Sequence, residues 1–281
     1  MAKFKVVTDS SVHLTQAEID QYGITILPLS TLLDGQVYQD GSEVEKNVFL
    51  DKMRESQELP KTSQPAIGFI VDTYNDLTED GSDILSIHVT HTLSGTVNGA
   101  AQAAQISEGK ITVIDSEFCA RAMAFQVLEA AKCAEKGLTI EETLPLLKAV
   151  RERTTLYISI VDLTNMIRGG RIGKTMGKIS QALNIKANLE MVGGALQADA
   201  KGRGTKAIVK RYEEILQEMK ATGVEIAEVG ITHDGLSKYS EKIIAMIREA
   251  YPSAKYETAF ASASVMSHAG PDAISFQFLR K

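Results

Sequence analysis

Residues 83–115 decide the fold of this chain, and they read DILSIHVTHTLSGTVNGAAQAAQISEGKITVID. The stretch begins with an apolar, β-rich run at Asp83–Val89 and continues into a small-residue helical pattern at Gly95–Gln105. It ends in a second β-rich run at Lys110–Asp115. Strands separated by helices in this way form parallel sheets, so the stretch predicts an α/β fold.

The same alternation extends through the first half of the chain. Lys3–Thr8 is expected to be a strand, and Ile24–Leu33 is a further apolar run. Helical periodicity is expected in the ranges 15–22, 48–54, 66–77, 117–135 and 140–153. Thr15 and Glu18 have capping-box spacing at the first of these helices. The pattern predicts a three-layer α/β/α domain with a mainly parallel sheet.

The pattern changes after Thr155. Two β-rich runs, Ile185–Val192 and Ala195–Ala200, flank Gly193-Gly194, which is a hairpin signal. Further strands are expected at 156–161, at 225–231 and near the C-terminus, with helices at 205–220 and 237–250. We therefore expect a second, two-layer α/β domain with a mixed sheet, so that the domains cover residues 1–155 and 156–281.

Composition is that of a soluble globular protein. Of the 281 residues, 44% are hydrophobic and 23% are charged, and the net charge is −6. This charge disfavours general attraction to nucleic acid or to anionic membranes. No apolar stretch is suited to secretion or to stable insertion into a membrane, so we expect a cytoplasmic protein.

Two cysteines, Cys119 and Cys133, occur in the chain. On one helix they would lie about 20 Å apart at 1.5 Å per residue. That separation is beyond the reach of a disulfide bond, so two reduced structural thiols are expected.

Polar residues gather where three predicted strands end or where helices begin. These clusters are Thr8–Ser11, Thr62–Pro65 and Thr90–Thr96. In open α/β sheets, ligands bind beyond the carboxyl ends of the strands, where loops and helix starts meet. The three clusters are therefore candidate parts of one binding site.

Ser94-Gly95-Thr96 is the most informative of these segments. Hydroxyl groups, unpaired backbone N–H groups and the positive end of a helix dipole together suit a carboxylate or a phosphate. The alternative is that Ser94 or Thr92 only caps the helix. For Asp9-Ser10, a local cap or turn is the preferred interpretation.

Ser94 is also a candidate nucleophile, with His268 as its base. The segment departs from the G-x-S-x-G nucleophile turn because Thr92 and Thr96 stand where that turn has glycine. The histidines have no zinc-motif spacing, and neither a G-x-G-x-x-G turn after a strand nor a Walker lysine motif occurs. A serine hydrolase or acyltransferase is thus one alternative function, and a sugar- or nucleotide-binding α/β module is another.

Two basic turns flanked by glycine lie in the second half. They are Arg168–Arg171 and Lys201–Gly204. Exposed arginines are usually only solvated, but two such turns in a small domain can also form a patch for an anionic partner surface.

Six short segments, in this order and spacing, resemble the DegV family, which includes the FakB-type fatty-acid-binding subunits of bacterial fatty-acid kinase. The resemblance extends over nearly the whole chain. Its anchors are Val7–Ser11, Thr62–Pro65, Leu93–Thr96, Ile114–Ser116, Gly169–Ile172 and His268–Pro271.

The resemblance implies a long-chain fatty acid buried between the two domains. Its carboxylate would be held by Thr62, Ser94 and His268, with help from the backbone N–H of Gly95. The protein itself would have no catalytic residue, no metal and no cofactor. An ATP-dependent kinase subunit would phosphorylate the presented carboxylate to an acyl-phosphate, as a step in bacterial phospholipid metabolism.

The resemblance also implies that Arg171 and Arg203 face that kinase. Two positions depart from the family pattern. Asp272 stands where glycine usually follows Gly-Pro, and we expect it to add a carboxylate close to the head-group site. Gly202-Arg203-Gly204 is looser than the usual basic run, which weakens the expected partner patch.

Overall fold

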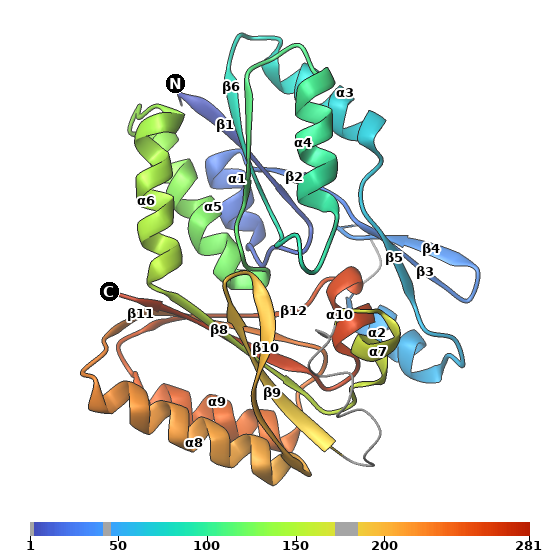
Figure 1. Cartoon of the computed structure of the whole chain (residues 1–281), viewed down its shortest axis with the longest axis vertical. Coiled ribbons are helices and arrows are strands. Elements are labelled where there is room, and N and C mark those ends of the chain that lie inside the picture. The colour runs from blue at the N-terminus through green and yellow to red at the C-terminus, as the bar shows by residue number, and fades with distance from the viewer. Residues whose placement is uncertain (1–2, 42–45, 172–184) are drawn as a thin grey trace.

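The computed structural model describes residues 3–41, 46–171 and 185–281. Two main β-sheets stack end to end along the long axis of the molecule, each with its own helices (Figure 1). The upper sheet belongs to the first half of the chain and the lower sheet to the second half.

The upper sheet has the strand order β2-β1-β6-β7, and all its pairs are parallel. The strands are β1 (Phe4–Asp9), β2 (Thr25–Leu27), β6 (Asp83–His88) and β7 (Ile111–Asp115). The helix α4 (Thr96–Ile106) connects β6 to β7. The strand–helix–strand unit expected at 83–115 is therefore confirmed.

Helices cover both faces of this sheet. Figure 1 shows α3 (Ile67–Thr78) and α4 on one side, and α1 (Gln16–Tyr22), α5 (Ala120–Glu135) and α6 (Ile140–Glu152) on the other. The predicted capping box at α1 is present, because Thr15 and Glu18 each bond the other's backbone amide. The helix ends at Gly23, whose φ of 59° favours glycine.

The helix α5 lies between the two sheets. It contacts β1 and β6 above and β8 (Thr154–Ile160), β11 (Ile226–His233) and β13 (Ile274–Arg280) below. A surface helix would bury one stripe, but nearly every side chain of α5 is buried. Its many alanines allow this close approach on both sides.

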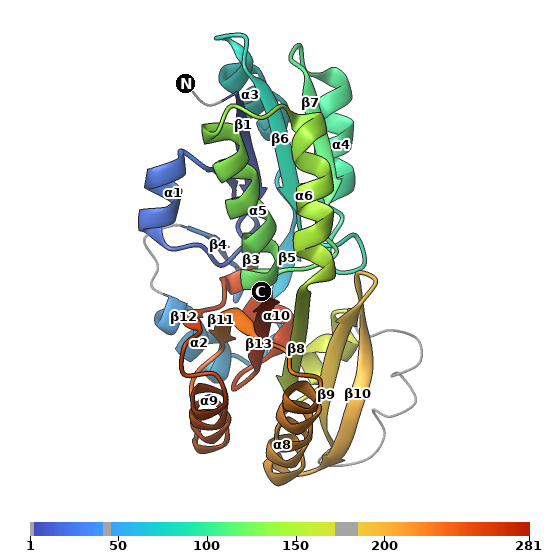
Figure 2. The same cartoon turned by 90° about the vertical axis from the view of Figure 1, so that its left-hand side faces the viewer.

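The lower sheet is mixed, with the strand order β10-β9-β8-β13-β11-β12. Only the pair of β11 with β12 (Lys255–Phe260) is parallel. The predicted hairpin is present as β9 (Ile185–Val192) and β10 (Ala195–Arg203), with Val192 opposite Ala195. Figure 2 shows α8 (Thr205–Ala221) and α9 (Lys238–Ala250) together on the outer face of this sheet.

A third, three-stranded sheet was not expected from the sequence. It consists of β3 (Ser30–Leu33), β4 (Gln36–Gln39) and β5 (Lys61–Ser63), in the order β4-β3-β5. The sequence pattern indicates no strand in the range 59–65. Backbone pairing of Thr31 with Thr62 holds β5 in this sheet.

One short helix, α10 (Ala263–Ala269), was not expected from the sequence. The helix α2 (Lys46–Glu55) packs Phe49 and Leu50 against Met266 of α10 (Ala263–Ala269). The helix α7 (Thr164–Arg168) also contacts α10.

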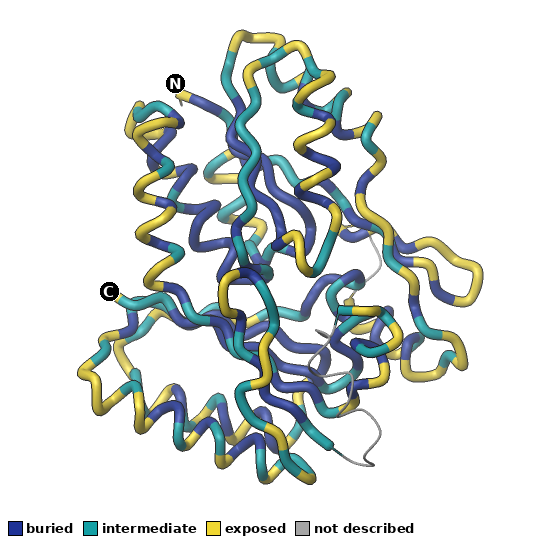
Figure 3. The backbone as a smooth tube through the Cα atoms, in the orientation of Figure 1, coloured by how far each residue is buried: buried dark blue, intermediate teal, exposed yellow. Residues whose placement is uncertain are grey.

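The chain passes from the upper to the lower sheet between Glu152 and Thr154. The range 30–63, however, packs on the C-terminal helix α10. Figure 3 shows buried backbone concentrated in the two sheets and at the level where they meet. The division into domains 1–155 and 156–281 stays a prediction about folding units.

Candidate functional site

A cavity of about 380 Å³ lies where the upper sheet, the lower sheet and α10 meet. This volume falls within the range of roughly 300–1,000 Å³ that is typical of small-molecule sites. Much of its wall is apolar, and these residues come from both halves of the chain: Leu29, Val89, Leu93, Cys119, Ala120, Leu156, Ile158, Met166, Leu196, Val265 and Ala269.

All four residues expected to bind a carboxylate line this cavity: Thr62, Ser94, Gly95 and His268. A series of contacts gathers them at one part of the wall. Thr62 and His268 are hydrogen bonded to each other, Gln64 packs on Gly95, and Arg171 bonds the carbonyl of Leu93 beside Ser94. The structure therefore joins an apolar space to a polar cluster.

Thr62 and His268 form the centre of this polar cluster. The Thr62 Oγ1 atom lies 2.8 Å from Nε2 of His268. His268 lies in the last turn of α10. The backbone of Gly169 packs closely against the imidazole of His268. A Cβ atom at position 169 would stand 2.6 Å from Nδ1. A side chain at position 169 would thus displace the ring.

His268 is neutral at pH 7. Burial lowers its pKa to about 4, and the positive charge of Arg171 acts in the same direction. Its Nδ1 atom has no hydrogen-bond partner among the described residues. If Nε2 carries the proton, it donates to Thr62, and the Thr62 hydroxyl is left to donate to a ligand. The pair can then act as a neutral hydrogen-bond donor to a carboxylate.

Ser94 caps α4 and still offers a donor to the cavity. Its Oγ accepts a hydrogen bond from the Thr96 amide at 3.2 Å and lies 2.8 Å from the Thr96 hydroxyl. When the buried Thr96 hydroxyl donates to Ser94, the Ser94 proton is available to a ligand. Gly95 follows as the N-cap residue of α4. The capping and anion-binding interpretations are therefore compatible.

Of the two arginines expected to face a partner, Arg171 lines the cavity and Arg203 does not. Arg171 lines the cavity, and it donates to the carbonyl oxygens of Leu93 at 3.0 Å and Gly169 at 2.6 Å. Arg203 ends β10, seven residues from the cavity residue Leu196, which corresponds to about 23 Å at 3.3 Å per residue. Their partner role stays a prediction, and Ile172 of the same motif lies outside the described residues.

The expectation for Asp272 is wrong. Its side chain is not among the cavity residues, and it pairs with Arg54 of α2 at 2.7 Å. The φ angle of Asp272 is 62°, in the region that favours glycine. The aspartate therefore adopts a backbone conformation suited to glycine and directs its charge to α2.

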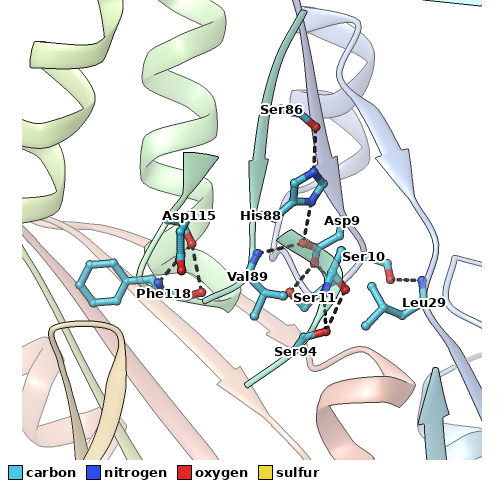
Figure 4. Close-up of polar contacts among 12 residues, drawn as sticks. Asp9, Ser10, Ser11, Leu29, Ser86, His88, Val89, Ser94, Asp115 and Phe118 are labelled. Carbon is cyan, nitrogen blue, oxygen red and sulfur yellow. Dashed lines mark hydrogen bonds and ion pairs between the residues drawn. The ribbon is translucent and has the colours of Figure 1, made fainter. Parts of the chain in front are cut away.

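A buried hydrogen-bond chain that the sequence did not indicate starts at the cavity. Figure 4 shows it: Ser11, which lines the cavity, donates to Asp9 at 2.6 Å, and Asp9 contacts Nδ1 of His88 at 3.0 Å. His88 continues through Nε2 to Ser86, at 2.7 Å. Asp9 also accepts the amide of Val89 at 2.9 Å.

Asp9 was interpreted as a local cap or turn, yet its contacts connect two strands. Val89 and His88 are 79 and more residues away in the sequence. Contacts at such separations give no local signal. The signal that was available is the pair of polar residues Ser86 and His88 within a largely buried strand.

The hydrolase alternative lacks a nucleophile–base contact. Ser94 bonds Thr96 and His268 bonds Thr62, and no hydrogen bond between Ser94 and His268 is formed in the described chain. Ser86, His88 and Asp9 are hydrogen bonded to one another as in a serine-hydrolase triad. All three, however, are fully buried. A substrate carbonyl has no access to them.

Two further features concern cysteines and metals. Cys119 and Cys133 are both free thiols, and Cys119 lines the cavity instead of being purely structural. Burial raises the pKa of Cys119 to about 12, so it is protonated and unreactive at pH 7. Over the described ranges, no group of three His, Cys, Asp or Glu side chains is arranged to hold a metal ion.

No helix in the described parts of the chain is both long and apolar enough to cross a membrane.

Comparison with known proteins places this architecture in a family. The family model for uncharacterised proteins of the DegV family matches residues 3–281. A DegV domain-containing protein of Streptococcus pneumoniae is 40% identical over 273 residues, which are 97% of each chain. One from Listeria monocytogenes is 38% identical over 279 residues, which are 99% of each chain.

Solved structures have the same fold. DegV from Bacillus subtilis, described as a fatty acid binding protein, superposes with a TM-score of 0.89 at 26% identity and covers 100% of both chains. A DegV family protein from Thermus thermophilus, described by its fatty acid binding, gives a TM-score of 0.88 at 29% identity over 100% of both chains.

Proposed function

This chain belongs to the DegV family, and from that premise we propose that it binds a long-chain fatty acid in the cavity between its sheets. The observation that carries the proposal is the union of an apolar space with the Thr62–His268–Ser94 cluster in one cavity. The fatty acid binding of the Bacillus subtilis and Thermus thermophilus structures supports it.

The apolar wall supplies most of the affinity. An acyl tail of about 14 methylenes gains on the order of 11 kcal/mol on burial, before the costs of association. A hydrogen bond to the charged carboxylate adds about 1.5–3 kcal/mol, and desolvation of the carboxylate offsets much of it. The polar cluster therefore contributes more to the orientation of the bound ligand than to its affinity.

Neutral donors suit this role. Thr62 and Ser94 offer hydroxyl hydrogens, and His268 fixes the orientation of Thr62 without adding charge. Arg171 supplies the positive charge at the cavity wall. A carboxylate would be held there by hydrogen bonds and by one cation.

We further propose that the protein presents this carboxylate to an ATP-dependent kinase subunit. A carboxylate oxygen attacks the terminal phosphorus of ATP, the acyl-phosphate forms, and ADP leaves. The partner supplies ATP and metal, and this chain only holds the acid. The absence of a Ser94–His268 contact supports a presenting role over a hydrolytic one.

Replacement of Ser94 by alanine tests the presentation. We expect Ser94→Ala to retain fatty acid, because the tail dominates binding, and to lose at least tenfold in acyl-phosphate yield with the kinase present. Ser107→Ala, at the other end of α4, is the matched control. An unchanged yield from Ser94→Ala would contradict the head-group assignment.

Arg171→Ala tests coupling to the partner. It should still bind the lipid while kinase turnover falls, and Arg203→Ala should reduce turnover by weakening docking alone. Normal turnover by both variants would remove the proposed docking role.

A further inference from the structure

The side chain of Gln64 lies in a slot on the first turn of α4. A Cβ atom on Gly95 would stand 2.5 Å from its Oε1, and one on Gly99 would stand 3.1 Å from its Nε2. Residues four apart lie on the same face of a helix, so the two glycines together make a flat seat for the carboxamide. Any side chain at position 95 would displace it.

The seated carboxamide is open to the cavity. Gln64 lines the cavity together with its neighbours Thr62, Ser94 and Gly95. Its side chain is exposed and forms no hydrogen bond with another described residue. An amide held in place by packing alone retains both of its donor hydrogens and its acceptor oxygen for another molecule.

The backbone around Gln64 is well fixed. The strand β5 ends one residue before it at Ser63, and the buried Pro65 follows it. The peptide before a proline is confined to extended conformations, which limits where the carboxamide can go. The backbone thus places the carboxamide beside the polar cluster, against the Gly95–Gly99 face of α4.

From these contacts we propose that Gln64 is a further head-group contact that donates a hydrogen bond to the ligand's carboxyl group beside Ser94 and fixes where that end stops. The inference rests on the proposed function, because the ligand is a fatty acid. Gly95 and Gly99 leave room for the Gln64 carboxamide on α4. The helix α4 would therefore contribute to the site through this face as well as through its N-terminus.

Titration of bound [1-13C]palmitic acid by carbon NMR, together with its dissociation constant, tests the inference. Gln64→Glu has the same shape but places a carboxylate against a carboxylate. We expect binding to weaken about tenfold and the pKa of the bound carboxyl group to rise by about one pH unit or more. Gln102→Glu, exposed on the same helix and away from the cavity, should change neither.

A second pair of variants separates the contact from general damage. Gly99→Ala should push the carboxamide by a few tenths of an ångström and weaken binding about threefold, but should have no effect on binding in a Gln64→Ala background. Gly68→Ala, in α3 with open space around it, is the control.

Unchanged affinity and carboxyl pKa in Gln64→Glu would overturn the inference. So would an effect of Gly99→Ala that persists without Gln64. Failure of the wild-type protein to bind palmitic acid would be a different result, since it would refute the proposed function and this inference with it.

Discussion

His88 and His268 both contact hydroxyl side chains, but they differ in what their second ring nitrogen meets. Nδ1 of His88 contacts Asp9, so both ring nitrogens have partners in a fully buried chain. Nδ1 of His268 has no partner in the described chain, and the ring stands at the wall of a cavity. The same residue type thus completes a buried chain in one region and lines the cavity in the other.

This contrast distinguishes structural polar clusters from functional ones. Buried polar groups of a stable fold are normally paired, because an unpaired one costs about 1–3 kcal/mol. A cluster that is complete within the protein needs nothing more. A cluster at a cavity wall that keeps a free donor hydrogen can accept a ligand, as the Thr62 hydroxyl can when Nε2 of His268 donates to it.

The largest expected effect is on the buried cluster. The Asp9 carboxylate accepts hydrogen bonds from Val89 and Ser11 and contacts Nδ1 of His88. In Asp9→Asn, the new NH2 group is itself a donor and would face one of these donor groups. We expect the free energy of unfolding to fall by about 3–5 kcal/mol. Urea denaturation measures this, with Asp20→Asn on the exposed face of α1 as the control. A loss of unfolding free energy below 1 kcal/mol would contradict a structural role for the Asp9–His88 cluster.

His13 is a third buried histidine, and its Nδ1 atom contacts a hydroxyl group instead of a carboxylate. It contacts the Thr232 hydroxyl at 3.0 Å, and burial lowers its pKa to about 3. Since the unfolded chain binds a proton below pH 6.5 and the folded chain does not, stability is lost as pH falls. From pH 6.5 to 4.5 this loss is about 2–3 kcal/mol.

His13→Gln should remove that component. The difference in unfolding free energy between the wild-type protein and the variant should decrease as pH falls from 6.5 to 4.5. A difference that stays constant over this window would contradict the lowered pKa.

A smaller effect is expected at the cavity. Thr62→Val removes the hydroxyl and leaves Nε2 of His268 without its partner. The ligand-free protein should lose about 1–2 kcal/mol of unfolding free energy. Thr73→Val, a half-buried threonine of α3 outside the cavity whose hydroxyl donates to the Phe69 carbonyl, is a matched control for the substitution itself. A stability equal to that of wild type would show that the Thr62–His268 pair is not formed in solution.

The smallest effect concerns the charge beside His268. Arg171→Ala should raise the pKa of His268, because the arginine disfavours the imidazolium, but burial should still hold it below 6.5. Nitrogen NMR of the ring follows the titration. Arg203→Ala should leave the pKa unchanged, and an equal shift in both variants would contradict the local origin of the effect.

Periodicity was enough to predict the two sheets and most helices. The strand–helix–strand unit at 83–115 and the Gly193-Gly194 hairpin have strong local patterns. β5 and α10 were missed because they are short and depend on partners distant in the sequence. Thr62 pairs with Thr31, and Met266 packs on Phe49.

The candidate site shows the same limit. Thr62, Ser94, Gly95 and His268 were identified through short motifs, and they meet at one cavity. The Asp9–His88 contact and the Asp272–Arg54 pair connect residues 79 and 218 positions apart. No spacing in the sequence could have indicated them.

Mass spectrometry of an organic extract from the purified, denatured protein shows whether the cavity holds a fatty acid. We expect about one long-chain fatty acid per wild-type molecule, almost none from Ile158→Trp, which fills the cavity, and a normal amount from the exposed control Ile106→Trp. A wild-type extract without fatty acid, or equal amounts from the wild-type protein and Ile158→Trp, would contradict the account.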